Sequence, residues 1–343
     1  MAETFDRPRS DLETQVQPIG AVGEFPPAQL PDAQLDGLQL PELPGEGLPG
    51  AEGGEISPHA SIFLRTVRVF VENKLAVVGL GVIVLAILFC CVGPFFYHTN
   101  QTNAQLALTQ IQNAHPSGQH LLGTDAQGFD IVGRLMYGGQ RSLMVGFAAA
   151  IMATIIGTAY GAISGFFGKW LDALMMRIVD ILLSIPILFF LIVLSAIFHP
   201  SLPILIVVIA VVSWLVPARL VRGNTLTLRV REYVQAVRVM GGSRTRIIFR
   251  HIIPNTIGTI IVNTTFQVAD AILILAALGY LGLGVQPPQT DWGSMLANGV
   301  NYALDGYWWE IFPALVAIVG VVVAFNFVGD ALRDSFEVRL QQR

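Results

Sequence analysis

The stretch from Ala218 to His251 reads ARLVRGNTLTLRVREYVQAVRVMGGSRTRIIFRH and lies between two long apolar stretches. It contains eight arginines and a single acid, Glu232. Loops beside membrane spans that carry such an excess of arginine stay on the cytoplasmic side. The stretch therefore predicts a membrane protein and sets the orientation of the spans on either side of it.

The composition agrees with lipid as the main solvent of the chain. Of 343 residues, 53% are hydrophobic and only 13% are charged, and the mean hydropathy is +0.61. Soluble domains usually carry about 25% charged residues. A helix needs roughly 20 apolar residues to cross the hydrocarbon layer. Six stretches are candidates, although the fourth is short and the fifth contains polar residues; they lie near 75–97, 142–167, 177–198, 202–217, 255–282 and 311–332. We expect an all-α membrane protein with six transmembrane helices.

Counting spans outward from the arginine-rich stretch places both chain termini in the cytoplasm. The positions of other basic residues agree with this orientation: Arg65, Arg68, Lys74, Lys169, Arg333, Arg339 and Arg343. Segment 283–310 contains three acids and no lysine or arginine, as an extracytoplasmic loop should. Arg134 is a mild exception, and six spans remain the consistent count.

The chain divides into three parts by composition. Residues 1–58 contain eleven acids, two arginines and nine prolines without apolar periodicity, which predicts a disordered acidic cytoplasmic tail. Residues 59–140 are expected to hold the first transmembrane helix and an extracytoplasmic segment. Residues 141–343 are expected to form a core of five membrane helices with a cytoplasmic loop at 218–254.

Within that loop, residues 229–240 place valines, a tyrosine and a methionine at helical spacing opposite a polar face. This pattern predicts a short amphipathic helix that ends at Gly241 and Gly242. Ser243 can cap a second helix, and Pro254 suits the first turn of the next span. The result is a cytoplasmic hairpin of two helices. Composition alone favours an anchor for lipid headgroups over a surface for a partner protein.

The order of residues in the hairpin changes that preference. The sequence Glu232-Tyr-Val-Gln-Ala236-Val-Arg238-Val-Met-Gly241, followed thirteen residues later by Pro254, resembles the loop motif of permease subunits of ATP-binding-cassette importers. In that family the loop forms a coupling helix that sits in a groove of the cytoplasmic ATPase. The resemblance implies that Glu232, Ala236, Arg238, Gly241 and Pro254 couple the chain to the ATPase.

Further segments extend the resemblance over most of residues 64–343, and they are similar to the C-type permease of oligopeptide, dipeptide and nickel importers. These segments are His120–Asp130, Met176–Pro186, Gly282–Pro288 and Asn326–Asp334. The resemblance implies the type I importer permease fold in a bacterial-type plasma (inner) membrane, with peptide as the solute. It also implies a second related permease, two ATPases that bind ATP and Mg²⁺, and an extracytoplasmic solute-binding protein.

The fifth stretch contains a polar strip, because Asn263, Gln267 and Asp270 share one helical face. Such a strip should avoid lipid, either by hydrogen-bonding to another helix or by lining a water-filled path. We favour the translocation path. Asp180 lies within a turn of Arg177 near a membrane face, and we expect it to form a structural ion pair.

The second stretch carries Gly157, Gly161 and Gly165 in steps of four. Small residues at this spacing let a neighbouring helix approach closely. We expect this neighbour to belong to the same chain rather than to a second copy.

No catalytic or metal-binding pattern competes with transport. The six histidines have no ligand spacing, and Gly168-Lys169 lacks the first glycine and the hydroxyl residue of a phosphate loop. We expect no enzyme activity, no cofactor bound by this chain and no nucleic-acid partner. The alternatives are a secondary transporter driven by an ion gradient, with Asp270 as the ion site, and a membrane-embedded enzyme.

Overall fold

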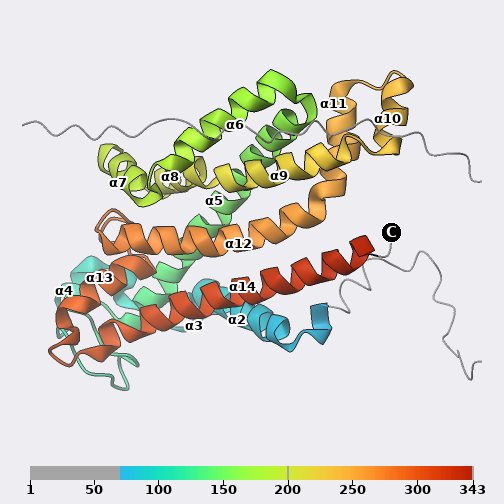
Figure 1. Ribbon diagram of the computed structural model, residues 1–343. Helices are drawn as coiled ribbons and strands as arrows, with labels where there is room; N and C mark the ends of the chain where they lie inside the picture. The colour runs from blue at the N-terminus through green and yellow to red at the C-terminus, as the bar shows by residue number, and fades with distance from the viewer. Residues whose placement is uncertain (1–69, 199–200, 342–343) are drawn as a thin grey trace, which may run out of the picture. The chain divides into compact units, whose positions relative to one another are not determined.

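The computed structural model describes residues 70–198 and 201–341, and the secondary structure of these residues is helical apart from one isolated β-bridge. The elements in chain order are α2 (Lys74–Cys91), α3 (Gly93–Phe96), η1 (Asn100–Thr102), α4 (Ala104–Leu108), α5 (Ile131–Phe167), α6 (Lys169–Ser184), α7 (Ile187–Ile197), α8 (Leu202–Ser213), α9 (Leu215–Leu228), α10 (Glu232–Val239), α11 (Arg244–Ile247), η2 (Ile248–Ile252), α12 (Ile253–Tyr280), α13 (Trp292–Ala303), η3 (Trp308–Glu310) and α14 (Phe312–Gln341) (Figure 1). The predicted tail at 1–58 and the start of the predicted part at 59–140 lie outside the described residues.

Four helical segments are long and apolar enough to cross a membrane: Lys74–Cys91, Ile131–Phe167, Arg244–Tyr280 and Trp308–Phe336. Two further pairs qualify if each bent pair is one span, namely α6 with α7, bent by 85°, and α8 with α9, bent by 42°. The described residues therefore contain up to six candidate spans, which agrees with the predicted count.

Prolines explain the two bends, which the sequence did not predict. Pro186 follows α6 and forces Ile185 into an extended conformation, with φ −84° and ψ 127°. Pro217 lies in the first turns of α9, which continues to Leu228 instead of ending near 217. Because proline removes a helical hydrogen bond and crowds the preceding turn, both spans change direction there.

Helix α5 begins at Ile131, eleven residues before the predicted start, because Asp130 caps it. One carboxylate oxygen of Asp130 accepts a hydrogen bond from the amide of Gly133 at 2.8 Å. The other accepts from the Tyr97 hydroxyl at 2.9 Å and lies 2.7 Å from Nδ1 of His120. Burial, with Asp130 as a second cause, raises the pKa of Tyr97 to about 12. The cap ties the start of α5 to the segment that precedes it.

Helix α5 contacts α2, α8, α9 and α12, and α12 lies beside α14 (Figure 1). The contact with α9 confirms that the small-residue strip packs within the chain. A β-carbon added to Gly161 would lie 2.2 Å from the Ala218 carbonyl oxygen, and one added to Gly157 would lie 2.7 Å from that of Trp214. Only hydrogen at these positions permits the observed approach.

Arg134, the exception to the charge pattern, is buried, with 4% of its surface exposed. Its Nε lies 2.7 Å from a carboxylate oxygen of Asp125, and its Nη2 donates to Gln127 at 2.7 Å. Burial raises the pKa of Asp125, while Arg134 and the amides of Phe129 and Gln127 act in the opposite direction. Arg134 is therefore internally paired and says nothing about orientation.

Segment 283–310, expected as a loop, contains α13. Asp291 caps this helix by accepting hydrogen bonds from Gly293 and Ser294 at 2.8 and 3.0 Å. The pKa of Asp291 is raised above its usual value, because burial outweighs the opposite effect of its hydrogen bonds. The adjacent Trp292 is 2% exposed, and its indole N–H donates to the Leu135 carbonyl at 3.0 Å. These contacts attach α13 to α5.

Candidate coupling site and polar strip

Helix α10 ends in a turn that only glycine accommodates well. Gly241 has φ +80°, and its amide donates a hydrogen bond to the backbone carbonyl of Arg238 at 3.1 Å. The amide of Gly242 donates to the backbone carbonyl of Val237 at 2.9 Å. This pair of bonds is the Schellman arrangement, which places glycine in the left-handed conformation just after a helix. A β-carbon on Gly242 would lie 2.6 Å from the Val237 side chain. Gly241 is therefore required by its backbone conformation, and Gly242 by the lack of space for a side chain.

Two side chains, Val234 and the partly buried Val237, attach α10 to the core of its own chain. Val234 is fully buried and packs in a cluster that includes Phe166, Val221, Ile247 and Ile252. The predicted apolar face also included residues that are largely exposed: Val230 at 63%, Tyr233 at 42% and Met240 at 77%. Val230 and Met240 lie outside α10, so the observed helix is shorter than the predicted helix at 229–240.

The opposite side of α10 is open. Glu232, Gln235, Ala236 and Val239 are all exposed and lie at i, i+3, i+4 and i+7, so they form one face. Val239 is 86% exposed, although a valine gains stability from burial. We call these four residues the α10 face. Its residues are one acid, one amide, one small residue and one apolar residue, and the described part of the chain leaves all four exposed.

Three arginines attach the hairpin to the last turn of α5. Nη1 of Arg229 donates to the Gly165 carbonyl at 2.8 Å. The guanidinium groups of Arg238 and Arg244 lie 5.6 and 5.4 Å from the ring centroids of Phe166 and Phe167. Cations are favoured at a helix C-terminus, where carbonyl groups lack partners. Arg238, a predicted coupling residue, therefore contacts its own chain while remaining exposed.

The second arm of the predicted hairpin is not a separate helix. The Ser243 hydroxyl caps α11, as predicted, by accepting from the amide of Arg246 at 3.3 Å. Helix α11 then continues through a π-helical turn, in which Ile253 donates to Ile248, into α12. Pro254 has no N–H to donate, and such wider turns commonly accommodate a break in the hydrogen-bond ladder. The arm is thus the beginning of the fifth span.

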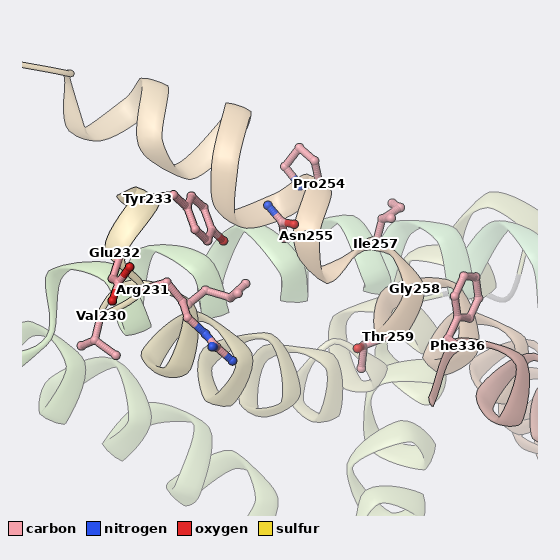
Figure 2. Close-up of a pocket in the computed structure, with 11 residues that line it drawn as sticks. Val230, Arg231, Glu232, Tyr233, Pro254, Asn255, Ile257, Gly258, Thr259 and Phe336 are labelled. Atoms are coloured by element: carbon pink, nitrogen blue, oxygen red, sulfur yellow. The ribbon is translucent and has the colours of Figure 1, made fainter. Parts of the chain in front are cut away.

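Two of the predicted coupling residues share one cavity, although 22 positions separate them. Figure 2 shows Glu232 and Tyr233 facing Pro254 and Asn255 across an open pocket of about 820 Å³, with Phe336 of α14 at its far end. Gly241 lines a second hollow, of about 320 Å³, together with residues of α11 and η2. The structure therefore places α10 between two indentations of the same surface.

One carboxylate joins three helices close to this site, and the sequence interpretation missed it. Asp172 of α6 accepts two hydrogen bonds from Arg222 of α9, at 2.6 and 2.7 Å, and one from Ser164 of α5 at 2.5 Å. Arg222 is 50 residues from Asp172 in the sequence, so no local pattern indicates the pair. Asp180 also forms an ion pair, as expected, but with Arg219 of α9 and not with its neighbour Arg177.

Arg222→Leu is expected to lower the free energy of unfolding by about 2 kcal/mol, because it leaves the Asp172 carboxylate buried without its counter-ion. The value is below that of a fully buried pair, since the Arg222 side chain is 33% exposed. Arg219→Leu is the matched control on the same helix. Both side chains of the Arg219 pair are 50% exposed, so a loss below about 0.5 kcal/mol is expected. Thermal unfolding of the purified proteins in detergent measures both, and equal losses would contradict the assignment.

The members of the polar strip have different surroundings. Asn263 is half-buried, and Asp270 is exposed. Gln267 is only 5% exposed, and its Nε2 donates to the Ser213 carbonyl at 3.0 Å. In this conformation Gln267 therefore hydrogen-bonds to a neighbouring helix. The assignment of Asn263 and Asp270 to a translocation path stays a prediction.

Among the described residues, no three side chains of histidine, cysteine, aspartate or glutamate lie close enough to hold a metal ion. The fold therefore combines several candidate membrane spans with a short exposed helix, α10. This combination fits a membrane transport permease.

This chain belongs to the family described as binding-protein-dependent transport system inner membrane components, whose model matches residues 157–342. The N-terminal transmembrane domain of oligopeptide transport permease C matches residues 61–116. The predicted family and the all-α permease fold are thereby confirmed, and the chain is a multi-pass inner-membrane permease subunit. This family gives no support to a transporter driven by an ion gradient.

Relatives with assigned names cover most of the chain. The dipeptide transport system permease protein of Alkalihalophilus pseudofirmus is 39% identical over 306 residues, which are 89% of this chain and 97% of the relative. The oligopeptide transport system permease protein of Haemophilus influenzae is 39% identical over 81% of this chain and 88% of its own length. That of Bacillus subtilis is 40% identical over 80% of this chain and 88% of its own length.

Proposed function

We propose that this permease imports peptides as one half of a translocation path, with a second related permease as the other half. The functions for which these relatives are named, dipeptide and oligopeptide transport, support this solute class. Two cytoplasmic ATPases would bind ATP and Mg²⁺, and an extracytoplasmic solute-binding protein would deliver the peptide. Both chain termini would lie in the cytoplasm, as the arginine-rich loop favours.

The observation that carries the proposal is the pairing of an exposed face with a rigid attachment. The α10 face has no covering from the described residues 70–198 and 201–341, and Arg229, Arg238 and Arg244 fix the same hairpin to the end of α5. A partner that binds the α10 face and moves it therefore also moves the end of α5. A surface helix without such contacts would not transmit this movement.

Closure of the ATPases on ATP would displace α10 and, through the three arginines, the C-terminal end of α5. The same displacement reaches α12, because the helical segment Arg244–Tyr280 starts at the hairpin and runs through the candidate span. Packed helices move as rigid bodies between discrete arrangements. Such movement would alternate access to a path that includes Asn263 and Asp270.

Ala236→Trp is expected to reduce ATP-dependent peptide uptake at least about tenfold, because a large side chain in the middle of the α10 face prevents close approach of the ATPase. Co-purification of the ATPases with the permease should fall in parallel. Uptake into vesicles containing the whole transporter, together with the ATPase content of the affinity-purified complex, measures these effects.

Leu304→Trp is the matched control for the ATPase content, because Leu304 is 97% exposed and lies after α13, in the segment expected on the opposite side of the membrane from the hairpin. It should leave the ATPase content of the purified complex unchanged. Normal uptake and an intact complex in Ala236→Trp would refute the coupling role of α10.

A further inference from the structure

The bend between α8 and α9 contains a carbonyl group that its own helix cannot satisfy. In an uninterrupted α-helix the amide of residue 217 would donate to the carbonyl of Ser213, four positions earlier. Residue 217 is proline, which has no amide hydrogen. Pro217 is buried against α5, where a β-carbon on Gly157 would lie 2.7 Å from the Cβ of Pro217. The missing donor must therefore come from elsewhere.

Gln267 supplies it. Its Nε2 donates to the Ser213 carbonyl at 3.0 Å from α12, 54 positions away in the sequence. Gln267 is 5% exposed, and its Oε1 has no hydrogen-bond partner among the described residues. The bond to Ser213 is thus what orients this side-chain amide. A buried amide held by one hydrogen bond serves the carbonyl that the proline leaves unpaired.

The two residues of this hydrogen bond lie on opposite sides of the hairpin in the sequence. One is on α8, before the hairpin, and the other is on α12, after it. Gln267 lies on the helical segment Arg244–Tyr280, whose first residues form the second arm of the hairpin. Ser213 lies at the bend, and α9 then runs to Leu228, directly before Arg229 and its bond to Gly165. A shift of α12 along its axis changes the distance from Gln267 to Ser213 unless the bend follows.

We propose that Gln267 is a positioning residue of transport, whose hydrogen bond to the Ser213 carbonyl, made necessary by Pro217, links the movement of α12 to the bend between α8 and α9. The inference rests on the proposed entry of force at the hairpin. It assigns Gln267 to the linkage between helices and not to the lining of the path.

The test is a pair of substitutions in the complete transporter, reconstituted in vesicles. Gln267→Leu keeps the volume of the side chain but removes the donor, and peptide uptake per ATP hydrolysed is expected to fall about fivefold. Pro217→Ala restores an amide at position 217 that can donate to Ser213, so it satisfies the carbonyl without joining the two helices. In the double variant, uptake per ATP is therefore expected to stay within about twofold of Gln267→Leu alone.

Thr265→Val is the matched control on the same helix, because its hydroxyl bonds only to the Ile261 carbonyl of its own helix, at 3.1 Å. It should leave the ratio unchanged. Wild-type uptake per ATP in Gln267→Leu overturns the proposal. So does a loss that Pro217→Ala rescues, because rescue would show that Gln267 only satisfies the Ser213 carbonyl and does not join the two helices.

The comparison of single and double variants distinguishes this inference from the function on which it rests. If α10 did not receive the force, Ala236→Trp would transport normally, whereas the comparison of single and double variants at 267 and 217 would still report on the hydrogen bond. Recovery of intact complex by size-exclusion chromatography is measured for each variant, so that uptake per ATP is compared only between assembled complexes.

Discussion

A Gly161→Ala protein is expected to lose about 3 kcal/mol of unfolding free energy, because its new β-carbon would lie 2.2 Å from the Ala218 carbonyl oxygen and 2.9 Å from the Arg222 amide nitrogen. Both are backbone atoms of α9, so no side-chain rotation can relieve the overlap. The two helices must separate, which also loosens the other small-residue contacts along the strip. Gly161→Leu should prevent recovery of folded protein.

Gly320→Ala is the matched control for this prediction. Gly320 lies in α14, and apart from the neighbouring backbone of its own helix no described atom lies within 4 Å of an added β-carbon. Alanine is favoured over glycine in a helix by about 1 kcal/mol, so this variant should be as stable as the parent or slightly more stable. Thermal unfolding of the two purified variants in one detergent gives the comparison. Equal melting temperatures would show that α5 and α9 are not in close contact.

Close packing of α5 on α9 also matters for coupling. Helix α9 carries Arg222, which holds Asp172 of α6, and it leads into Arg229, which holds the end of α5. If α5 and α9 separate, displacement of the hairpin no longer reaches α6. Partial variants such as Gly157→Ala are therefore expected to lose transport before they lose folded protein.

Features set by neighbouring residues could be predicted from the sequence. The end of α10 at Gly241 is one, because the left-handed turn after a helix requires a residue without a β-carbon at that position. The cap of α11 by Ser243 is another. The number of spans also followed from the sequence, since apolar length along the chain decides whether a helix can cross a membrane.

Features set by contacts between distant residues could not be predicted. Pro217 indicates a break in a helix but not which donor repairs it, and the polar strip shows which residues share a face but not which helix that face meets. The sequence therefore did not show that Gln267 hydrogen-bonds to Ser213 or that Asp180 pairs with Arg219. Each partner lies dozens of positions away on α8 or α9.

Helix α13 was missed for a related reason. It is too short and too polar to resemble a span, and its stability depends on Trp292 packing against α5. Trp292→Ala is accordingly expected to lower the unfolding free energy by about 4 kcal/mol. The side chain is 2% exposed, and a β-carbon on Gly139 of α5 would lie 2.7 Å from its ring. Its removal therefore leaves a cavity that the facing helix, with glycine at this point, cannot fill.

Trp308→Ala separates this loss from a general effect of removing an indole, because Trp308 is 51% exposed and should cost less than about 0.5 kcal/mol. Trp292→Phe keeps most of the volume but leaves the Leu135 carbonyl without the indole donor, so an intermediate loss of about 1–2 kcal/mol is expected. Differential scanning calorimetry of the three variants in detergent gives the order. A Trp292→Ala protein as stable as Trp308→Ala would mean that α13 is not docked on α5 and that the segment between the fifth and sixth spans is a loop, as its composition first indicated.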